Sequence, residues 1–406
     1  MSKWQTKLLK QLYTPLSNLS YSRECLTETP QQVAYIHYGD IHTDKIPEVV
    51  SGKTTLAFLL DSISIPSEEK YLLKEGDIVL VDASEDYEGV GKSIEISAIQ
   101  NKKIVAGLHT IALRPIDATN LAPGFGRYLL KHPLVSKRLK AIAQGTKVFS
   151  ISFTLIQKLK VLLPPIEEQR KIVEVLETWD KAITLTKQLI EQKELQKKYL
   201  MQQLLTGHAR LTGFTGKWKL LPLSEILKER KEYQTKNQEL PHLSLTKEGV
   251  LPKTERYNRD FLVKDEDKLY KITHENDICY NPANLKFGVI CRNQYGSGIF
   301  SPIYVTYEVT KYNSGFVGYL LTLPSSIAQA RRFEEGTVYE RMAVSSEDFL
   351  KVKLPFPTCE EESSQISIVI RKAEEEIYLL KQKLAKLEEQ KKGLMQALLT
   401  GKVRLK

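Results

Sequence analysis

The sequence lacks the features that mark several common classes of protein. Its 406 residues include only four cysteines, which form no CxxC pair, and seven scattered histidines. This spacing fits no usual zinc-ligand pattern and gives no basis for a disulfide framework. No stretch approaches the roughly 18 apolar residues that span a bilayer, and the first residues lack the apolar run of a signal peptide. We therefore expect a cytoplasmic protein with no metal site and no membrane segment.

Complete catalytic motifs are also missing. The segment GVGKS at 89–93 resembles the end of a phosphate-binding loop, but Asp86 stands where that pattern needs glycine, so a hairpin turn is favoured. The segment NPAN at 281–284 resembles part of an adenine methyltransferase motif but lacks the aromatic residue that stacks on the flipped base. His37 and His42 are interpreted as polar surface, and no GxSxG or HExxH pattern occurs. The chain is predicted to bind without catalysing.

The charge balance permits a nucleic-acid partner. The 59 Lys and Arg residues exceed the 49 Asp and Glu residues, which gives a formal net charge of +10. Every part of the chain carries both signs, and no segment is a basic tail. Binding to nucleic acid would therefore depend on folded surfaces.

The clearest positive feature is an internal duplication. The segment YLMQQLLTGHARL at 199–211 is nearly repeated as GLMQALLTGKVRL at 393–405. Positions from Gly124 to Pro164 also recur about 191 residues later, and the offset becomes 194 after three extra residues in the second copy. Upstream, only short echoes remain, such as EGDIVLVDA at 75–83 and ENDICYNPA at 275–283. A long repeat of this kind decides the architecture before any motif does.

Each copy predicts a mixed globular domain followed by a long helix. Short alternating strands are expected in AFLLDSISI, DIVLVDA and SGIFSPIYVTYEV, and one helix is expected over 125–144 and over 316–335. The predicted fold class is α+β, with two similar globular domains and two long helices. The boundaries are 1–163 and 214–355 for the domains, and 164–213 and 356–406 for the helical regions.

The two helices show a coiled-coil pattern. Apolar residues recur at alternating steps of four and three, and the first helix has more polar positions in this series. Gly207 and Gly401 stand where helix C-termini prefer glycine. The predicted apolar seam consists of Ile172, Leu176, Trp179, Ile183, Ile190, Leu200, Leu204, Ile366, Ile370, Ile377, Leu380, Leu384, Leu387, Leu394 and Leu398.

A continuous seam must be buried against a partner. We expect the two helices to pair antiparallel, with pseudo-two-fold symmetry within the chain, and so to fix the separation of the two domains. The alternative is that each helix packs back on its own domain.

Both domains contain segments suited to DNA contact. Lys and Arg can neutralise phosphates, whereas Asn, Gln, Thr and Arg can read base edges. The candidates are His37, Tyr38, Lys45, Lys53, Thr54, Lys92, Gln144, Thr146, Lys147, Lys247, Asn284, Lys286, Arg292, Asn293, Tyr295, Arg331, Thr337, Tyr339 and Arg341.

The ordered motifs resemble one known family. The series LPPIEEQRKIVEVLETWDKAI and LMQQLLTG recurs as LPFPTCEEESSQISIVI and LMQALLTG, and YIHYGDI, GDIVLVDA and KWKLLPLSEI add to the likeness. Together these segments resemble the specificity (S) subunit of Type I restriction-modification enzymes over the whole chain. One departure is that Glu-Ser-Ser-Gln at 362–365 replaces Glu-Gln-Arg-Lys at 168–171.

The resemblance implies a non-catalytic, DNA-binding subunit of a host-defence restriction system. Each target recognition domain would bind one half of a bipartite asymmetric sequence in double-stranded DNA, and the coiled coil would space the halves. Two methyltransferase (M) subunits would use S-adenosylmethionine to methylate adenine, and restriction (R) subunits would use ATP and Mg. This chain itself would hold no cofactor. The departure at 362–365 leaves the equivalence of the two M-docking surfaces open.

Three other functions are weighed against this interpretation. The domains could bind proteins in a scaffold, the chain could be a fused adenine methyltransferase, or it could be a repressor, although no helix-turn-helix pattern is present. Steep salt dependence of duplex binding would separate DNA recognition from a scaffold role.

Overall fold

The computed structural model describes residues 4–43, 45–66, 68–87, 89–99, 102–117, 119–235, 240–253, 269–336 and 342–405. It divides into two compact units. Unit 1 comprises Met1–Thr186 and Lys383–Lys406, and unit 2 comprises Lys187–Gln382. Two helices of 40 residues each, α5 (Ile166–Leu205) and α9 (Glu360–Leu399), contribute one part to each unit. Within the described residues, no helix is long and apolar enough to cross a membrane.

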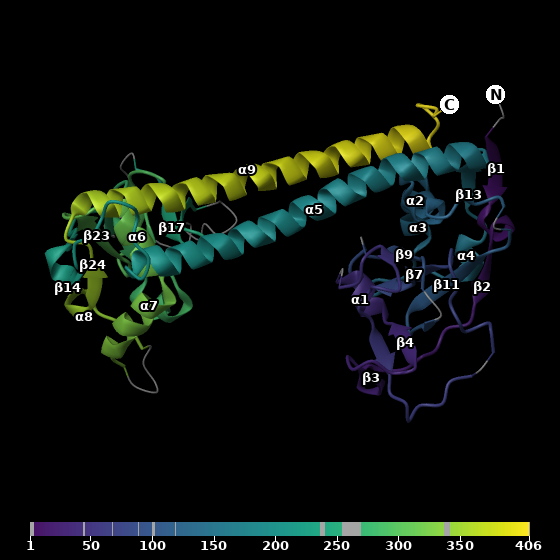
Figure 1. The fold of residues 1–406 in the computed structure, drawn as a ribbon, viewed down its shortest axis with the longest axis horizontal. Coiled ribbons are helices and arrows are strands. Elements are labelled where there is room, and N and C mark those ends of the chain that lie inside the picture. The colour runs from purple at the N-terminus through teal and green to yellow at the C-terminus, as the bar shows by residue number, and fades with distance from the viewer. Residues whose placement is uncertain are drawn as a thin grey trace. The chain divides into compact units, whose positions relative to one another are not determined.

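Among its described residues, unit 1 carries four sheets and four short α-helices in addition to its parts of α5 and α9. Figure 1 labels several of these elements. Its strands are β1 (Gln5–Leu8), β2 (Tyr13–Leu16), β3 (Leu26–Thr27), β4 (Val33–Ile36), β5 (Val49–Val50), β6 (Ala57–Leu59), β7 (Ile78–Val81), β8 (Ala83–Ser84), β9 (Ser93–Ile96), β10 (Lys103–Ala106), β11 (Thr110–Pro115), β12 (Phe149–Ser150) and β13 (Lys160–Leu163). Its short helices are α1 (Tyr38–His42), α2 (Phe125–Lys131), α3 (Pro133–Ile142) and α4 (Phe153–Ile156).

Unit 2 has the same general composition in its described residues. Its strands are β14 (Lys219–Pro222), β15 (Leu227–Glu229), β16 (Tyr233–Gln234), β17 (Leu243–Leu245), β18 (Val250–Pro252), β19 (Tyr270–Thr273), β20 (Ile278–Tyr280), β21 (Ile290–Arg292), β22 (Gly298–Phe300), β23 (Val305–Val309) and β24 (Lys353–Phe356). Its helices are α6 (Ser314–Thr322), α7 (Pro324–Ala330) and α8 (Ser346–Lys351), with a 3-10 turn, η6, at Pro282–Phe287.

The two units share one framework of strands. The order β2-β11-β7-β9 in unit 1 corresponds to β15-β23-β20-β21 in unit 2, and unit 1 adds β5 at the edge. In each unit the first strand pairs antiparallel with the strand before the long helix, β1 with β13 and β14 with β24. The remaining sheets differ, with β10-β4-β6-β3 in unit 1 and β16-β19-β22 in unit 2. The predicted fold class of two similar α+β domains, each followed by a long helix, is confirmed.

The expected single helix near the end of each domain is wrong in detail. Each is broken into two helices, α2 and α3 in unit 1 and α6 and α7 in unit 2. The breaks fall at His132 and Leu323, whose ψ angles of 129° and 138° are non-helical. Both residues precede proline, which disfavours the helical conformation of its predecessor and starts a new helix well. The prolines Pro133 and Pro324 were visible in the sequence and should have predicted the break.

The long helices end as the sequence predicts. Gly207 has φ +73° and Gly401 has φ +70°, which is the left-handed conformation that glycine adopts at low cost. Their amides bond to the carbonyls of Leu204 and Leu398. Acidic residues occupy the first turn of both helices, where they suit the positive end of the helix dipole.

The seam is buried or half-buried throughout. None of its fifteen predicted residues is exposed, and Ile172, Leu176, Ile366 and Ile370 are fully buried. The first turns of α5 join the core of unit 1 together with Leu398 and Leu399 of α9. Unit 2 repeats this arrangement with the first turns of α9 and the last turn of α5. The two long helices therefore pack on each other, as predicted. Each helix also packs on its own domain, which the prediction had treated as the alternative.

The ion pairs show that the helices run in opposite directions in each unit. In unit 2, Lys193 pairs with Glu376 at 2.8 Å and Lys197 pairs with Glu374 at 3.2 Å, so a higher number on α5 meets a lower one on α9. In unit 1, Asp180 of α5 pairs with Lys391 of α9. The antiparallel prediction is confirmed within each unit.

Candidate nucleic-acid interface

Each domain is joined to the paired helices by a matching polar triad. In unit 1 the Tyr128 hydroxyl on α2 donates to Asp180 at 2.5 Å, and Asp180 also pairs with Lys391. In unit 2 the equivalent Tyr319 on α6 donates to Glu374 at 2.5 Å, and Glu374 pairs with Lys197. Burial, followed by the hydrogen bond to the carboxylate, raises the pKa of both tyrosines.

The triads explain two of the charged residues at seam positions. Lys391 and Lys197 occupy seam positions, and the triads give each ammonium group a carboxylate partner on the opposite helix. Buried polar residues at such positions fix the register of paired helices. The triads therefore fix the register of the paired helices and the orientation of each domain on the helix segments of its own unit.

A second matching contact lies at the start of each long helix. The Glu168 carboxylate accepts two bonds from Arg404, both 2.7 Å, and one from the Trp4 indole at 2.9 Å. In unit 2, Glu362 likewise accepts bonds from Arg210 at 2.6 and 2.8 Å and from the Trp218 indole at 3.2 Å. We call each set a Trp-Glu-Arg clamp. Hydrogen bonds from Arg404 lower the pKa of Glu168.

The departure at 362–365 also has a structural explanation. Gln169 is buried and bonds to Ala122 and to the carbonyls of Asn120 and Pro164, which ties α5 to its domain. Ser363, at the equivalent place in α9, is buried and accepts the Asn313 amide at 3.2 Å. The replacement of Gln169 by Ser363 therefore changes buried contacts within each unit and not the exposed surface of the helix.

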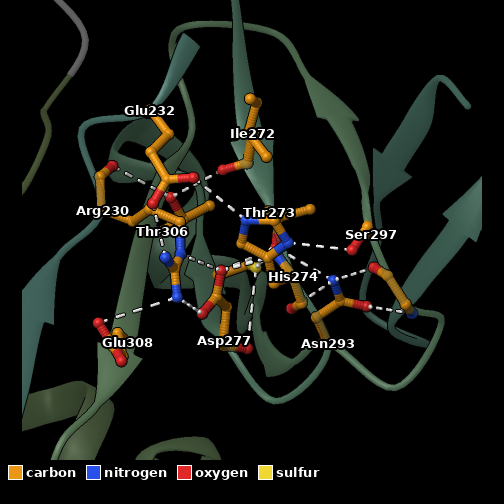
Figure 2. Close-up of polar contacts among 12 residues, drawn as sticks. Arg230, Glu232, Ile272, Thr273, His274, Asp277, Asn293, Ser297, Thr306 and Glu308 are labelled. Atoms are coloured by element: carbon orange, nitrogen blue, oxygen red, sulfur yellow. Dashed lines mark hydrogen bonds and ion pairs between the residues drawn. The ribbon is translucent and has the colours of Figure 1, made fainter. Parts of the chain in front are cut away.

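In each unit a buried aspartate pairs with a partly exposed arginine in the sheet framework. In unit 2, shown in Figure 2, Arg230 makes two bonds to Asp277, of 2.9 and 3.0 Å, and a third to Glu232 at 2.7 Å. In unit 1, Arg114 makes two bonds to Asp77, of 2.9 and 2.6 Å. The two aspartates occupy matching positions in the echoes EGD and END. Arg114 lies in β11, whereas Arg230 directly follows β15, so simple alignment of the copies could not find the pairs.

Around this pair, Figure 2 shows a polar network at one end of the sheet. His274 bonds to Ser297 at 3.0 Å and to Glu232 at 3.2 Å. Asn293 is fully buried, and its amide donates to Thr273 and to the carbonyls of His274 and Gly296. Direct contact of Asn293 with DNA would require these bonds to break.

At the opposite end of the β20–β21 hairpin, unit 2 presents an aromatic side chain with two cations. Phe287, at the end of η6, is 56% exposed. The ammonium of Lys286 lies 5.1 Å from its ring centroid, and that of Lys247, from the turn between β17 and β18, lies 6.0 Å away. Lys286 and Lys247 are both predicted DNA contacts, and both lie over the ring of Phe287, which the prediction omitted. Lysines beside an exposed ring suit a surface that meets phosphates and bases at once.

In unit 1 the predicted contact His37 is mainly structural. It is buried, and its Nδ1 caps α1 by accepting the Gly39 amide at 3.0 Å. Burial, reinforced by Arg23, lowers the pKa of His37, which keeps this nitrogen free to accept. Tyr38 stacks beside it and meets His109 edge to face with ring centroids 5.3 Å apart.

The remaining predicted contacts differ in exposure. The exposed ones are Lys45, Lys53, Gln144, Thr146, Lys147, Lys247, Lys286, Tyr295 and Arg331, and the partly exposed ones are Tyr38, Thr54, Lys92, Asn284 and Arg292. Some are already engaged, since Lys45 pairs with Glu28 and Lys92 donates to the His42 carbonyl at 2.8 Å. Thr337, Tyr339 and Arg341 lie outside the described residues. No metal-binding group of His, Cys, Asp and Glu occurs among the described residues.

Comparison with known proteins identifies the class. A family model described as the Type I restriction modification DNA specificity domain matches residues 1–195.

The full chain resembles particular specificity subunits. It is 26% identical to the putative type I restriction enzyme MjaX specificity subunit of Methanocaldococcus jannaschii, covering 99% of this chain and 94% of the relative. It is 22% identical to the MjaVIII specificity subunit of the same organism, covering 84% and 82%. The resemblance to Type I specificity subunits is confirmed.

Solved structures share the fold. The S subunit of the Type I system from M. genitalium aligns with TM-score 0.55 and 14% identity, covering 98% of this chain and 96% of that one. A structure described as showing complex assembly and conformational transition of the type I R-M system aligns with TM-score 0.59 and 16% identity, with the same coverage.

Proposed function

We propose that this chain is the non-catalytic DNA-recognition subunit of a Type I restriction-modification complex. It binds a bipartite, asymmetric duplex sequence, with one half contacted by each domain. The proposal rests on a contrast between two features of the units. The triads and clamps, which attach each domain to the long helices, match in the two units, whereas the surfaces available to DNA differ. The triads and clamps recur at equivalent positions in both units, whereas the sheets outside the shared framework differ, with β10-β4-β6-β3 in unit 1 and β16-β19-β22 in unit 2.

The long helices supply the spacing in this proposal. Each contains 40 residues, which corresponds to about 60 Å at 1.5 Å per residue. Two domains related by an approximate dyad would meet DNA half-sites about 34–36 Å apart, one turn of the duplex, on the same side. The matching triads and clamps agree with the approximate two-fold symmetry of the DNA backbone. The different surfaces of the two domains agree with a target whose two halves differ in sequence.

The proposed partners are two methyltransferase subunits and, in a complete system, restriction subunits. S-adenosylmethionine belongs to the former, and ATP and Mg to the latter. Exposed apolar side chains away from the seam support docking on the helices. Leu195 and Tyr199 of α5 and Leu379 of α9 are all more than half exposed, which is unusual unless a partner covers them. Cytoplasmic location is part of the same proposal.

The decisive experiment is co-expression with a cognate methyltransferase subunit and mapping of N6-methyladenine across a genome. A two-part motif with a fixed gap is expected, and neither subunit alone should produce it. Replacing residues 1–163 with those of a relative should change one half of the motif only. A change in both halves, or a continuous motif, would contradict the assignment of one half-site to each domain.

Two rival functions give different results. A protein scaffold would bind duplex DNA without the steep salt dependence that several phosphate contacts produce. A fused methyltransferase would crosslink to labelled S-adenosylmethionine in the absence of other subunits, and we expect no crosslink.

A further inference from the structure

Unit 1 contains a lysine-rich hollow outside the predicted contacts. It has a volume of about 480 Å³ and lies between α3 and the C-terminal part of α9. Four lysines line it, Lys131, Lys137, Lys140 and Lys392, together with Ser136. No Asp or Glu is among the residues lining this hollow. We call it the lysine hollow.

Two of these lysines are available to an external anion. Lys137 and Lys392 are exposed and form no ion pair among the residues that the structure describes. Lys131, by contrast, pairs with Glu48 at 2.5 Å. Pro133, the first residue of α3, also lines the hollow, so the positive end of that helix adds to the field.

Unit 2 has a hollow at the equivalent place with fewer lysines. It has a volume of about 380 Å³ and is lined by Lys198, Leu323 and Pro324, among others. The repeat offsets of 194 and 191 relate these residues to Lys392, His132 and Pro133 of unit 1. At the positions equivalent to Lys131 and Lys137, unit 2 has Thr322 and Ala328. The shape is therefore duplicated with less charge, because unit 2 keeps Lys198 and has Arg331 in place of Lys140, and Arg331 pairs with Glu334 at 2.9 Å.

We propose that the lysine hollow binds backbone phosphates of duplex DNA beside the half-site contacted by unit 1. This inference rests on the proposed function. Lysine ammonium groups and the Ser136 hydroxyl are suitable donors to phosphate oxygens, and such contacts position a protein without reading sequence.

Two observations favour DNA over an acidic protein partner. Two identical copies of a methyltransferase subunit would need similar surfaces on both units, whereas unit 2 lacks two of the four lysines of the hollow. The hollow is also next to a predicted DNA contact. Tyr87, in its lining, packs on Phe149 with ring centroids 5.1 Å apart, and Phe149 follows the exposed segment of Gln144, Thr146 and Lys147.

The test is binding of the full chain to a fluorescein-labelled 30-base-pair duplex of arbitrary sequence (about three helical turns), measured by anisotropy over a range of salt concentrations. The variant Lys137→Gln/Lys392→Gln should bind more weakly, with the slope of log K against log salt reduced by about 1.8, because two phosphate contacts are lost. Lys137→Arg/Lys392→Arg should retain the wild-type slope. The matched control Lys198→Gln, in the hollow of unit 2, should also leave it unchanged.

The outcomes separate the two levels of the proposal. Wild-type chain that binds duplex with no salt dependence would contradict DNA recognition itself. Wild-type chain with a steep slope, together with an unchanged slope in the Gln variant, would overturn the lysine hollow alone. If that variant instead co-purified less co-expressed methyltransferase subunit, the hollow would be a protein contact. A thermal melt equal to wild type confirms that the exposed substitutions leave the fold intact.

Discussion

Substitution of Glu362 by alanine should destabilise unit 2 strongly. The Glu362 side chain is 1% exposed and holds both Arg210 and the Trp218 indole. Its removal leaves a guanidinium and an indole N–H without their acceptor at the junction of α5, α9 and β14.

The magnitude follows from the burial of the pair. Breaking a buried ion pair costs about 3–5 kcal/mol. Because Arg210 is 25% exposed and keeps its bond to the Gly216 carbonyl, water can hydrate part of the released charge. We therefore expect a loss of about 2–3 kcal/mol in the free energy of unfolding. For a unit of this size, the melting temperature should fall by about 5–10 °C.

Differential scanning calorimetry of the full chain measures this change. The control is Glu360→Ala, which removes an exposed carboxylate from the same first turn of α9 and should change stability by less than about 0.5 kcal/mol. In the double variant with Arg210→Ala, the loss should be smaller than the sum of the single losses, because both remove one interaction. A melting temperature of Glu362→Ala equal to that of the control would refute the clamp.

Four further results are expected. Lys391→Met should cost about 1 kcal/mol by urea unfolding, because Asp180 loses its cation but keeps its tyrosine and some water; no loss would show that the triad is dispensable. Arg114→Lys should cost about 2 kcal/mol, because lysine cannot make both bonds to the buried Asp77; equal stability would refute the paired geometry. Since the folded-state pKa of Glu168 is lowered, its stabilisation is present above the unfolded value of about 4.3 and is lost as pH falls through the lower folded value. The melting temperatures of wild type and Glu168→Gln should therefore converge below about pH 4; a constant difference would contradict this. Insertion of seven residues into each long helix adds about 10.5 Å, or about 3 base pairs, to the gap of the methylated motif without altering its halves; altered halves would contradict the spacing role.

The periodic features of the fold were predictable from sequence. Alternating steps of four and three from Ile172 and from Ile366 place the seam, since helical periodicity depends only on local spacing. Gly207 and Gly401 mark the helix ends because the left-handed conformation strongly favours glycine. The duplication itself predicts two similar domains.

The polar contacts were not predictable in the same way. Arg404 and Glu168 are 236 residues apart, and Arg114 of β11 meets Asp77, which precedes β7, across 37 residues. Asn293 occurs in a segment that the sequence predicts to be a loop, where it would be accessible to DNA. In the structure it is buried at the centre of a hydrogen-bond network. Composition and spacing state which groups can form bonds, but only the folded backbone decides which partner each one meets.

The composition of the two units sets an order of assembly during synthesis. Residues 187–382 form an uninterrupted stretch, whereas the other unit needs residues from 383 onward to complete its core and its clamp. On the ribosome, the half encoded later can thus acquire its full set of contacts first. Unit 1 can complete its core only after residues 383–406 have been synthesised. Deletion of these residues would therefore destabilise unit 1, although most of that unit lies far from them in sequence.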